Sequence, residues 1–555
     1  MCPADERIIG VASIVVAPGG YRAIPSRIQA GDAIGFQPGT YDVPLVIQGA
    51  AGTRKHPVVI GPDRGERHGS STFTSGLGMD EVRLWANALA DRRQRAGYYP
   101  SVGQVGDFAM LTLRNCRYVA IHGLDFEDCW PTAIYLDNCQ HVVIHDIRFR
   151  GGTIAIGANG IDTHDIVVQH CDWRQDTSAG HDMWNRIPWG RIHGASDNEA
   201  DAQVDLAGDW RCWDGDFFRA WNVSGNVIIR NNRVSDAFNA IHVFNSHDRL
   251  APGVAPDSLT FNGGRQASAN VLIEDNDFVR IRDNVFEPES HAWNWVIRRN
   301  RLLDCFRPFS FELDRAGWFY IYENTAAFVT RPSTDMSTAD AARFEPRSNP
   351  TLFKLGGAQR NEGPIHVVNN SWYMGVGKGV FASGALGRLI HANNAIQFGD
   401  KAKAGMFGPE GPVATVPSSD DETAEATRFT RRWSDLDIRM FADVSNDPSF
   451  PDVYGRVGYP LGAGSVHATS LFVAPDAAVP NFAAASPALI GTAVDVPIAL
   501  PDGSTKALAG GHHRGAVQTG GPLSGLDCML GFLPNDVWLP QLPAPRGRAG
   551  PDGAA

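Results

Sequence analysis

The chain has 555 residues and a net charge of -12, with Asp+Glu 61 against Lys+Arg 49. This acidic balance argues against a nucleic-acid ligand, because proteins that bind the phosphate backbone usually present a basic face. No run of 18 or more apolar residues occurs, so we expect no membrane insertion, while 43% hydrophobic residues are enough for a packed interior.

The first residues, MCPADERIIGVASIVVAPGG, carry acids where a signal peptide needs a basic segment, so IIGVASIVVA is interpreted as a first strand. The eight cysteines form no CxxC pair and show no metal-ligand spacing. We therefore expect buried free thiols. A stretch at 79–99 is compatible with an amphipathic helix lying on or capping the remainder of the fold.

An apolar-x-apolar strand followed by a polar turn recurs along the chain, as in YVAIHGLDF, HVVIHDIRF, NVLIEDNDF and NWVIRRNRL. The last apolar residue before each turn is Ile121, Ile144, Val168, Ile229, Ile273, Ile297, Ile321, Val367 and, more loosely, His391. Successive steps are 23, 24, 61, 44, 24, 24, 46 and 24 residues. A unit of this length is too short for a propeller blade and suits one coil of a β-helix.

One coil cannot bury its own apolar residues, so we expect Val and Ile to stack on like residues of the coils above and below. Asparagine recurs at one turn, at positions 232, 276, 300, 324, 370 and 394. An amide side chain there tolerates a left-handed backbone and bonds to its neighbour, so these residues are interpreted as structural.

These repeats resemble those of the pectate-lyase-type β-helix superfamily, which holds polysaccharide lyases, glycoside hydrolases, sugar epimerases and phage tailspikes. GDAIGFQPGTYDVPLVIQGAAGTRKHPVVIGP (31–62) is similar to the first coils of many members, and SPALIGTA (486–493) with HHRGAVQ (512–518) to a closing segment. The resemblance implies an all-β, right-handed parallel β-helix over roughly residues 10 to 520. It identifies the fold better than the activity, because this fold carries many chemistries.

Four regions are predicted from these patterns. Residues 1–110 form an N-terminal cap and first coils, and residues 111–400 form the main stack with insertions at 174–225, 245–268 and 327–350. Residues 401–535 form C-terminal coils and a cap, and the Pro/Gly-rich segment 536–555 is expected to be a disordered, dispensable tail. Insertions in solenoids tend to gather over one face and build the site.

Three successive coils place a polar residue after an apolar one beyond the asparagine turn: FNAIHVF (238–244), DNVFEPES (283–290) and RPFSFELDR (307–315). If Ile241, Phe286 and Phe311 point inward, then His242, Glu287 and Glu312 point outward and stack. Carboxyl groups one coil apart suit the nucleophile and acid/base of a retaining glycosidase. The predicted catalytic residues are Glu287, Glu312, Asp283, His242 and Asp236.

Tryptophans in the first insertion lie among acidic residues, a combination that suits sugars, whose C–H faces stack on aromatic rings. The alternative is that these rings only fasten a long loop to the stack. The predicted substrate-binding residues are Trp184, Trp189, Trp210, Trp213, Glu289, Arg307 and Arg315.

The favoured function is a glycoside hydrolase or transglycosylase without a required cofactor, although Asp283, Glu287 and Glu289 also suit a Ca²⁺ ion. The first alternative is a lyase or epimerase on uronic acids. No lysine occurs between Lys55 and Lys354, which argues against a lysine base on the central coils. The second alternative is a non-catalytic glycan-binding or fibre protein. A poly- or oligosaccharide is the expected partner, and the resemblance implies a periplasmic or secreted location without a visible signal peptide.

Overall fold

The computed structural model describes residues 12–63, 70–76, 109–177, 211–244, 268–289, 292–312, 316–332, 350–356, 363–377, 388–399, 438–447, 464–501, 503–518 and 538–543. Shorter pieces lie near residues 182–192, 361 and 379–381. The segment 79–99, predicted as a helix, lies outside the described residues, as do Cys2 and Cys528. None of the described helical segments is long and apolar enough to cross a membrane.

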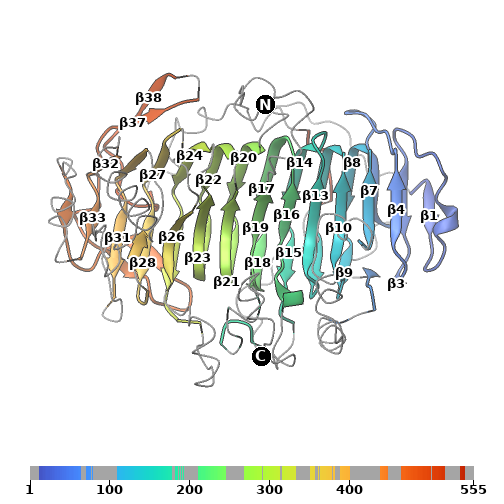
Figure 1. Ribbon diagram of the computed structural model, residues 1–555, viewed down its shortest axis with the longest axis horizontal. Helices are drawn as coiled ribbons and strands as arrows, with labels where there is room; N and C mark the ends of the chain where they lie inside the picture. The colour runs from blue at the N-terminus through green and yellow to red at the C-terminus, as the bar shows by residue number, and fades with distance from the viewer. Residues whose placement is uncertain are drawn as a thin grey trace, which may run out of the picture.

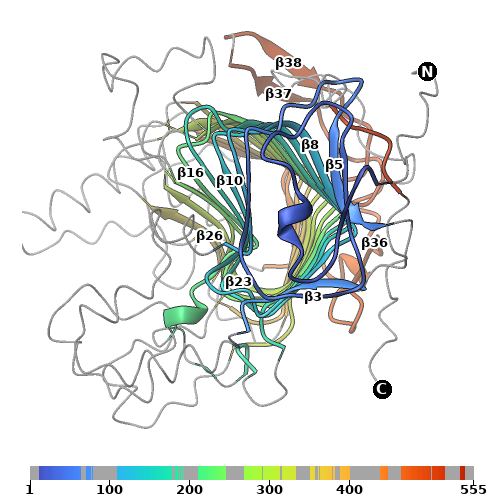
Figure 2. The ribbon, with the colours of Figure 1, turned by 90° about the vertical axis from the view of Figure 1, so that its right-hand side faces the viewer.

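The chain is a right-handed parallel β-helix in which each coil contributes strands to three faces (Figures 1 and 2). Figure 2 looks along the stack and shows successive coils superposed. The strands of a face pair in parallel, coil upon coil, so the apolar residues of each coil are covered by its neighbours.

The first face is a 13-stranded parallel sheet. Its strands are β1 (Ile14–Val16), β2 (Ala33–Phe36), β5 (Val58–Pro62), β8 (Arg117–His122), β11 (Gln140–His145), β14 (His164–Gln169), β17 (Gly225–Arg230), β20 (Ser268–Glu274), β22 (Ala292–Arg298), β24 (Gly317–Tyr322), β27 (Ile365–Val368), β30 (Leu389–Ala392) and β32 (Ile438–Phe441).

The second face follows an asparagine-bearing corner. It contains β3 (Gly39–Tyr41), β6 (Ser71–Phe73), β9 (Asp125–Glu127), β12 (Arg148–Arg150), β15 (Asp172–Arg174), β18 (Arg233–Ala237), the first parts of β21 (Asp277–Pro288) and β23 (Arg301–Glu312), β25 (Thr325–Phe328), β28 (Ser371–Met374), β31 (Ala395–Phe398), β33 (Val444–Ser445) and β34 (Val466–His467).

The third face closes each coil. It contains β4 (Leu45–Gln48), β7 (Leu111–Arg114), β10 (Thr132–Asp137), β13 (Ile154–Asn159), β16 (Phe218–Trp221), β19 (Ile241–Phe244), the second parts of β21 and β23, β26 (Thr351–Gly356) and β29 (Gly379–Phe381). Because β21 and β23 run on from the second face, the two faces form one 21-stranded sheet. Single-turn 3-10 helices lie at Tyr21–Ala23 and Arg211–Trp213.

The repeat read from the sequence is the repeat of the structure. The anchor residues from Ile121 to His391 pair with one another in the same order along the first face. They face the interior, because all but His391 belong to the hydrophobic core between the three faces. The β-helix prediction is therefore confirmed, coil by coil, over this part of the chain.

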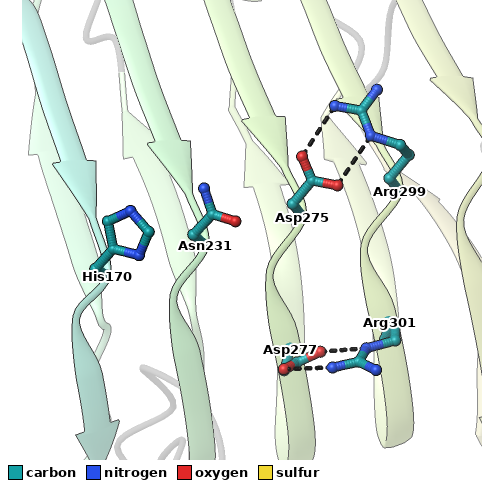
Figure 3. Close-up of a pocket in the computed structure, with 6 residues that line it drawn as sticks. All are labelled: His170, Asn231, Asp275, Asp277, Arg299 and Arg301. Carbon is teal, nitrogen blue, oxygen red and sulfur yellow. Dashed lines mark hydrogen bonds and ion pairs between the residues drawn. The ribbon is translucent and has the colours of Figure 1, made fainter. Parts of the chain in front are cut away.

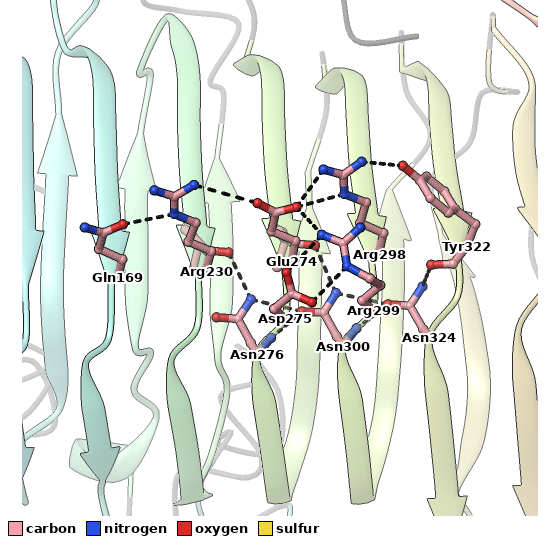
Figure 4. A network of polar contacts seen from close by, with 12 residues as sticks. Gln169, Arg230, Glu274, Asp275, Asn276, Arg298, Arg299, Asn300, Tyr322 and Asn324 are labelled. Carbon is pink, nitrogen blue, oxygen red and sulfur yellow. Dashed lines mark hydrogen bonds and ion pairs between the residues drawn. The ribbon is translucent and has the colours of Figure 1, made fainter. Parts of the chain in front are cut away.

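The six repeated asparagines form a buried ladder at the corner between the first and second faces (Figure 4). The backbone N–H and side-chain Nδ2 of each donate to the Oδ1 of the next, as from Asn276 to Asn300 at 3.1 and 2.9 Å. The predicted bonding between neighbours is confirmed. The left-handed residue is the one before each asparagine, for example Arg299 with φ 52° and Glu323 with φ 54°, so that detail of the prediction was wrong.

The outer side of the first face is also buried, which explains its nearly continuous apolar strands. Outward residues such as Ile228, Leu272 and Val296 belong to a second apolar cluster. This cluster includes the antiparallel hairpin of β37 (Val496–Ala499) and β38 (Thr505–Leu508), and Trp538. A second antiparallel pair is β35 (Phe472–Ala474) with β36 (Asn481–Ala484).

Two predicted boundaries change. Strand β16, expected inside the insertion at 174–225, belongs to the third face, where Phe218 pairs with Ile156 and Ile241. Trp538, expected in the disordered tail, is buried, and its Nε1 donates to the Arg54 carbonyl at 3.1 Å. Trp538 also packs edge-on against Tyr118, so this part of the tail is docked on the first coils.

Six cysteines of the described chain are free and buried, as expected: Cys116, Cys129, Cys139, Cys171, Cys212 and Cys305. Five of them directly follow a corner residue with positive φ, for example Cys139 after Asn138 and Cys305 after Asp304. A small apolar side chain fits the inside of such a tight corner.

Candidate active site

A row of polar side chains crosses five neighbouring strands of the third face. The register pairs Phe218 with Ile241, Phe286, Phe309 and Phe353 in succession, and all five side chains are buried in the core. The residue after each faces away from the core, because side chains alternate along a strand. The resulting row is Arg219, His242, Glu287, Ser310 and Lys354.

His242 lies between two glutamates. Its Nδ1 is 3.5 Å from Glu287 Oε2, and its Nε2 is 3.2 Å from Glu289 Oε1. Asn284 donates from Nδ2 to Glu287 Oε1 at 2.7 Å, and the Ser310 hydroxyl lies 3.4 Å from the same oxygen. The Glu287 carboxyl is thus fixed from three sides.

Arg219 is bound by two aspartates of the preceding loop. Its Nε donates to Asp216, and its Nη2 lies 3.6 Å from Asp214 Oδ1. Asp216 Oδ1 is also 3.8 Å from His242 Nδ1. We call Asp214, Asp216, Arg219, His242, Glu287, Glu289 and Lys354 the third-face cluster.

Burial dominates the electrostatics of this cluster. It raises the pKa of Glu287 to about 7, although the charges of His242 and Lys354 act in the opposite direction. Burial also raises the pKa values of Glu289 and Asp214 to about 7. The pKa of His242 is lowered by burial, so its imidazole is neutral near pH 7. The site can therefore exchange protons near neutral pH, or gain from a bound cation.

Three side chains are arranged as metal ligands. One atom each from His242, Glu287 and Glu289 lies within 4.8 Å of the other two. A cation would ionise carboxyl groups whose pKa values burial raises, so the residues fit such an ion. Asp283, which the sequence added to Glu287 and Glu289, is not in this group among the described residues.

The register does not stack Glu287 on Glu312, so that part of the prediction was wrong. Phe286 pairs with Phe309, whereas Phe311 pairs with Leu355 and Glu312 with Gly356. The neighbour of Glu287 on the next coil is therefore Ser310. The error came from aligning Phe286 with Phe311, although β21 and β23 change register between Ile281 and Asn284.

Asp236 and Asp283 occupy structural surroundings. Asp236 receives hydrogen bonds from Arg280 at 2.5 and 2.8 Å and also lies 3.3 Å from Arg174, which contradicts its placement as a modulator of Glu287. Asp283 is buried, and its charge raises the pKa values of Asp214 and Glu287.

The tryptophans of the first insertion fasten it to the stack. Trp184, Trp189 and Trp213 are at most 9% exposed and form a separate apolar cluster with Phe238 and Phe306. They offer no open ring to a sugar, so their assignment to substrate binding was wrong. Arg307 places its guanidinium 5.2 Å from the Phe306 ring centre. Trp210 and Arg315 lie outside the described residues.

Sequence reasoning missed Arg219, Ser310 and Lys354 as members of one row. It also argued against a lysine on the central coils, whereas Lys354 sits on β26, directly beside Ser310. Aligning the segments on their inward aromatic residues (FRAW, IHVF, FEP, FSF and FKL) would have revealed the row.

No protein-family model matches the sequence, and no curated protein matches it. Among solved structures, pectate lyase Pel9A is similar, with 11% identity, a TM-score of 0.42 and coverage of 92% of this chain and 97% of the other. A mannuronic acid specific family 6 polysaccharide lyase from human gut microbiota has 12% identity, a TM-score of 0.40 and coverage of 82% and 91%. The family 28 exopolygalacturonase of Yersinia enterocolitica has 10% identity, a TM-score of 0.37 and coverage of 71% and 78%. Likeness this distant assigns no residue of the site.

Proposed function

We propose that the chain is a carbohydrate-active enzyme that cleaves a polysaccharide containing uronic acids by β-elimination at the third-face cluster. The observation that carries this proposal is the row of side chains. It sets Lys354 two coils from Glu287, beside a group of three potential cation ligands. Elimination needs both parts: positive charge against the carboxylate of the sugar, and a base for its C5 proton.

His242, Glu287 and Glu289 would hold a divalent cation. The bound cation would neutralise the carboxylate of the uronic acid and so make its C5 proton more acidic. An imidazole nitrogen beside two carboxylates suits Mn²⁺ or Zn²⁺ better than Ca²⁺, which takes oxygen ligands. Arg219 is held by Asp214 and Asp216, so we assign it to positioning.

Lys354 is the proposed base. It is partly exposed, and its charge reaches Glu287, Glu289 and His242, whose pKa values it lowers. In the reaction a base takes the C5 proton, a double bond forms between C4 and C5, and the C4–O bond breaks. The leaving oxygen takes a proton from water, and the product is an unsaturated sugar.

Hydrolysis is the second candidate, and one observation favours it. Glu287 and Glu289 both have pKa values raised to about 7, and they bring ligand atoms within 4.8 Å. Two carboxyl groups near this spacing serve as nucleophile and acid/base in retaining glycosidases, where they lie about 5 Å apart. In that case Glu289 takes the role that the sequence gave to Glu312.

The test is the action of purified enzyme on polygalacturonate, polymannuronate, polyguluronate and neutral xylan, followed by reducing ends and by the ultraviolet absorbance of unsaturated sugar. The variants are Glu287→Gln and Lys354→Met, with Glu312→Gln as the control from the neighbouring strand. Unsaturated product from a polyuronate, lost in both variants and kept in the control, supports elimination.

New reducing ends without unsaturated product would instead establish hydrolysis. Glu287→Gln and Glu289→Gln should then lose activity, while Lys354→Met keeps it. No new ends from any polysaccharide in this set would contradict both candidates.

A further inference from the structure

A second polar hollow lies on the opposite side of the coils from the third-face cluster. It has a volume of about 420 Å³ and opens at the corner between the first and second faces (Figure 3). Its lining residues are His170, Asn231, Asp275, Asp277, Arg299 and Arg301. We propose that this corner groove binds a neutral oligosaccharide and holds the chain to a polysaccharide. This binding does not depend on the reaction at the third-face cluster.

The charges of the groove cancel within it. Arg299 donates from Nε and Nη2 to the two carboxylate oxygens of Asp275, at 2.9 Å each. Arg301 binds Asp277 in the same two-pronged way, at 2.5 and 2.7 Å. A polyanion would have to displace these carboxylates, whereas a neutral ligand leaves both pairs intact.

The same groups suit hydroxyls. A sugar hydroxyl donates and accepts at once, and the groove supplies carboxylate acceptors, guanidinium donors and the Asn231 amide, which does both. No tryptophan, tyrosine or phenylalanine is among the described lining residues, so recognition would rest on hydrogen bonds. The volume lies within the range of small-ligand pockets.

The groove is fixed before any ligand arrives. Asp277 and Arg301 are register partners on β21 and β23, and Asp275 and Arg299 occupy equivalent corner positions one coil apart. Figure 3 shows His170, Asn231, Asp275 and Arg299 side by side on successive coils. Polar groups held in this way lose little side-chain freedom on binding, which favours affinity.

The test is isothermal titration calorimetry with cellohexaose, xylohexaose, maltohexaose and hexagalacturonate as probes, in a Glu287→Gln background that prevents turnover. The variant is the double change Asp277→Ala and Arg301→Ala, which removes one ion pair without leaving a single charge. The matched control is Asp172→Ala with Arg150→Ala, another pair between neighbouring coils of the second face, at 2.7 Å and outside the groove. Thermal unfolding confirms that both variants are folded.

We expect at least one neutral hexasaccharide to bind, with affinity reduced about tenfold or more in the groove variant and unchanged in the control. Three outcomes overturn the proposal: no neutral probe binds, the two double variants weaken binding equally, or only hexagalacturonate depends on Asp277 and Arg301. Cleavage of the polysaccharides by wild-type enzyme is measured separately, so failure of the proposed reaction would leave this result readable.

Discussion

Glu287 shows how a single residue acquires its chemistry from its strand. Its carboxyl lies beside His242, Asn284 and Ser310, each brought to it by the register of the third face or by its own strand. Burial raises its pKa to about 7, so it changes charge in the range where enzymes usually work.

The free energy of unfolding should therefore depend on pH through Glu287. Its folded pKa lies above its unfolded value, so the stabilising effect is complete below pH ~4.5 and is lost as the pH rises through about 7. We expect metal-free wild type to lose up to about 3 kcal/mol between these values, shared with neighbouring acids. Urea unfolding at a series of pH values measures this.

Glu287→Gln provides the comparison, because glutamine carries no titrating proton. Its stability should change less over the same pH interval than that of wild type. Equal slopes for the two proteins would mean that Glu287 is ionised in the folded state throughout, against the pKa given above.

The asparagine ladder is the element that ties the coils together at one corner. Asn300 donates from Nδ2 to the Ile273 carbonyl at 2.9 Å and to Asn324, while its own Oδ1 accepts from Asn276. The ladder ends at Asp443, which accepts from Asn394 and binds His391 at 2.7 Å. An acid is suitable at the end because no further residue needs a donor from it.

Asn300→Ala should lower the free energy of unfolding by about 2–4 kcal/mol, because it leaves buried donors and a carbonyl without partners. Asn300→Asp should also destabilise, since it removes the Nδ2 donor. Chemical denaturation of both is compared with Asn481→Ala at an exposed position. A loss in Asn300→Ala no greater than in this control would show that the ladder is not stabilising.

The first insertion is held by its own small core. Trp184 donates from Nε1 to Thr330 at 3.0 Å, and Thr330 in turn donates to Asp304 at 2.7 Å. These contacts tie the insertion to a coil much later in the sequence. Buried rings therefore replace the exposed sugar platforms that the sequence suggested.

Trp184→Ala should cost about 3–5 kcal/mol, as expected for a buried tryptophan, whereas Trp184→Phe should cost much less and keep the KM of the wild type. Thermal unfolding and steady-state kinetics on the polysaccharide found to be a substrate check these expectations. A large rise in KM for Trp184→Phe at unchanged stability would return this ring to the substrate site.

On the scale of the whole molecule, the end of the chain returns to its beginning. Trp538 packs on Tyr118 and bonds Arg54, and the Pro543 carbonyl lies 3.0 Å from His145 Nε2. The hairpin β37–β38 covers the same face further along, where the Tyr320 hydroxyl donates to the Ala499 carbonyl at 2.9 Å.

Removal of residues 536–555 should therefore destabilise the protein by about 2–4 kcal/mol, because it exposes the ring of Trp538's site and the apolar face beneath. Removal of residues 545–555 alone is the control and should leave the thermal midpoint unchanged. Equal midpoints for the two truncations would show that the docked segment adds no stability.

Periodicity was enough to predict the coils. The spacing of Ile121, Ile144 and Val168 reflects a local rule, that every coil must offer apolar side chains to its neighbours, and such rules are legible in the sequence. The asparagine positions were legible for the same reason, because each occupies an equivalent corner.

What the sequence by itself determined is the parallel β-helix, its asparagine corner and the nomination of His242, Glu287 and Glu289. Tertiary structure decided the rest: Glu287 lies beside Ser310 instead of Glu312, Lys354 enters the row, and the insertion tryptophans are buried. The physical reason is register. A bulge between Ile281 and Asn284 shifts the pairing by one residue, and a shift of that size changes which side chains meet across coils without changing the periodicity of either strand.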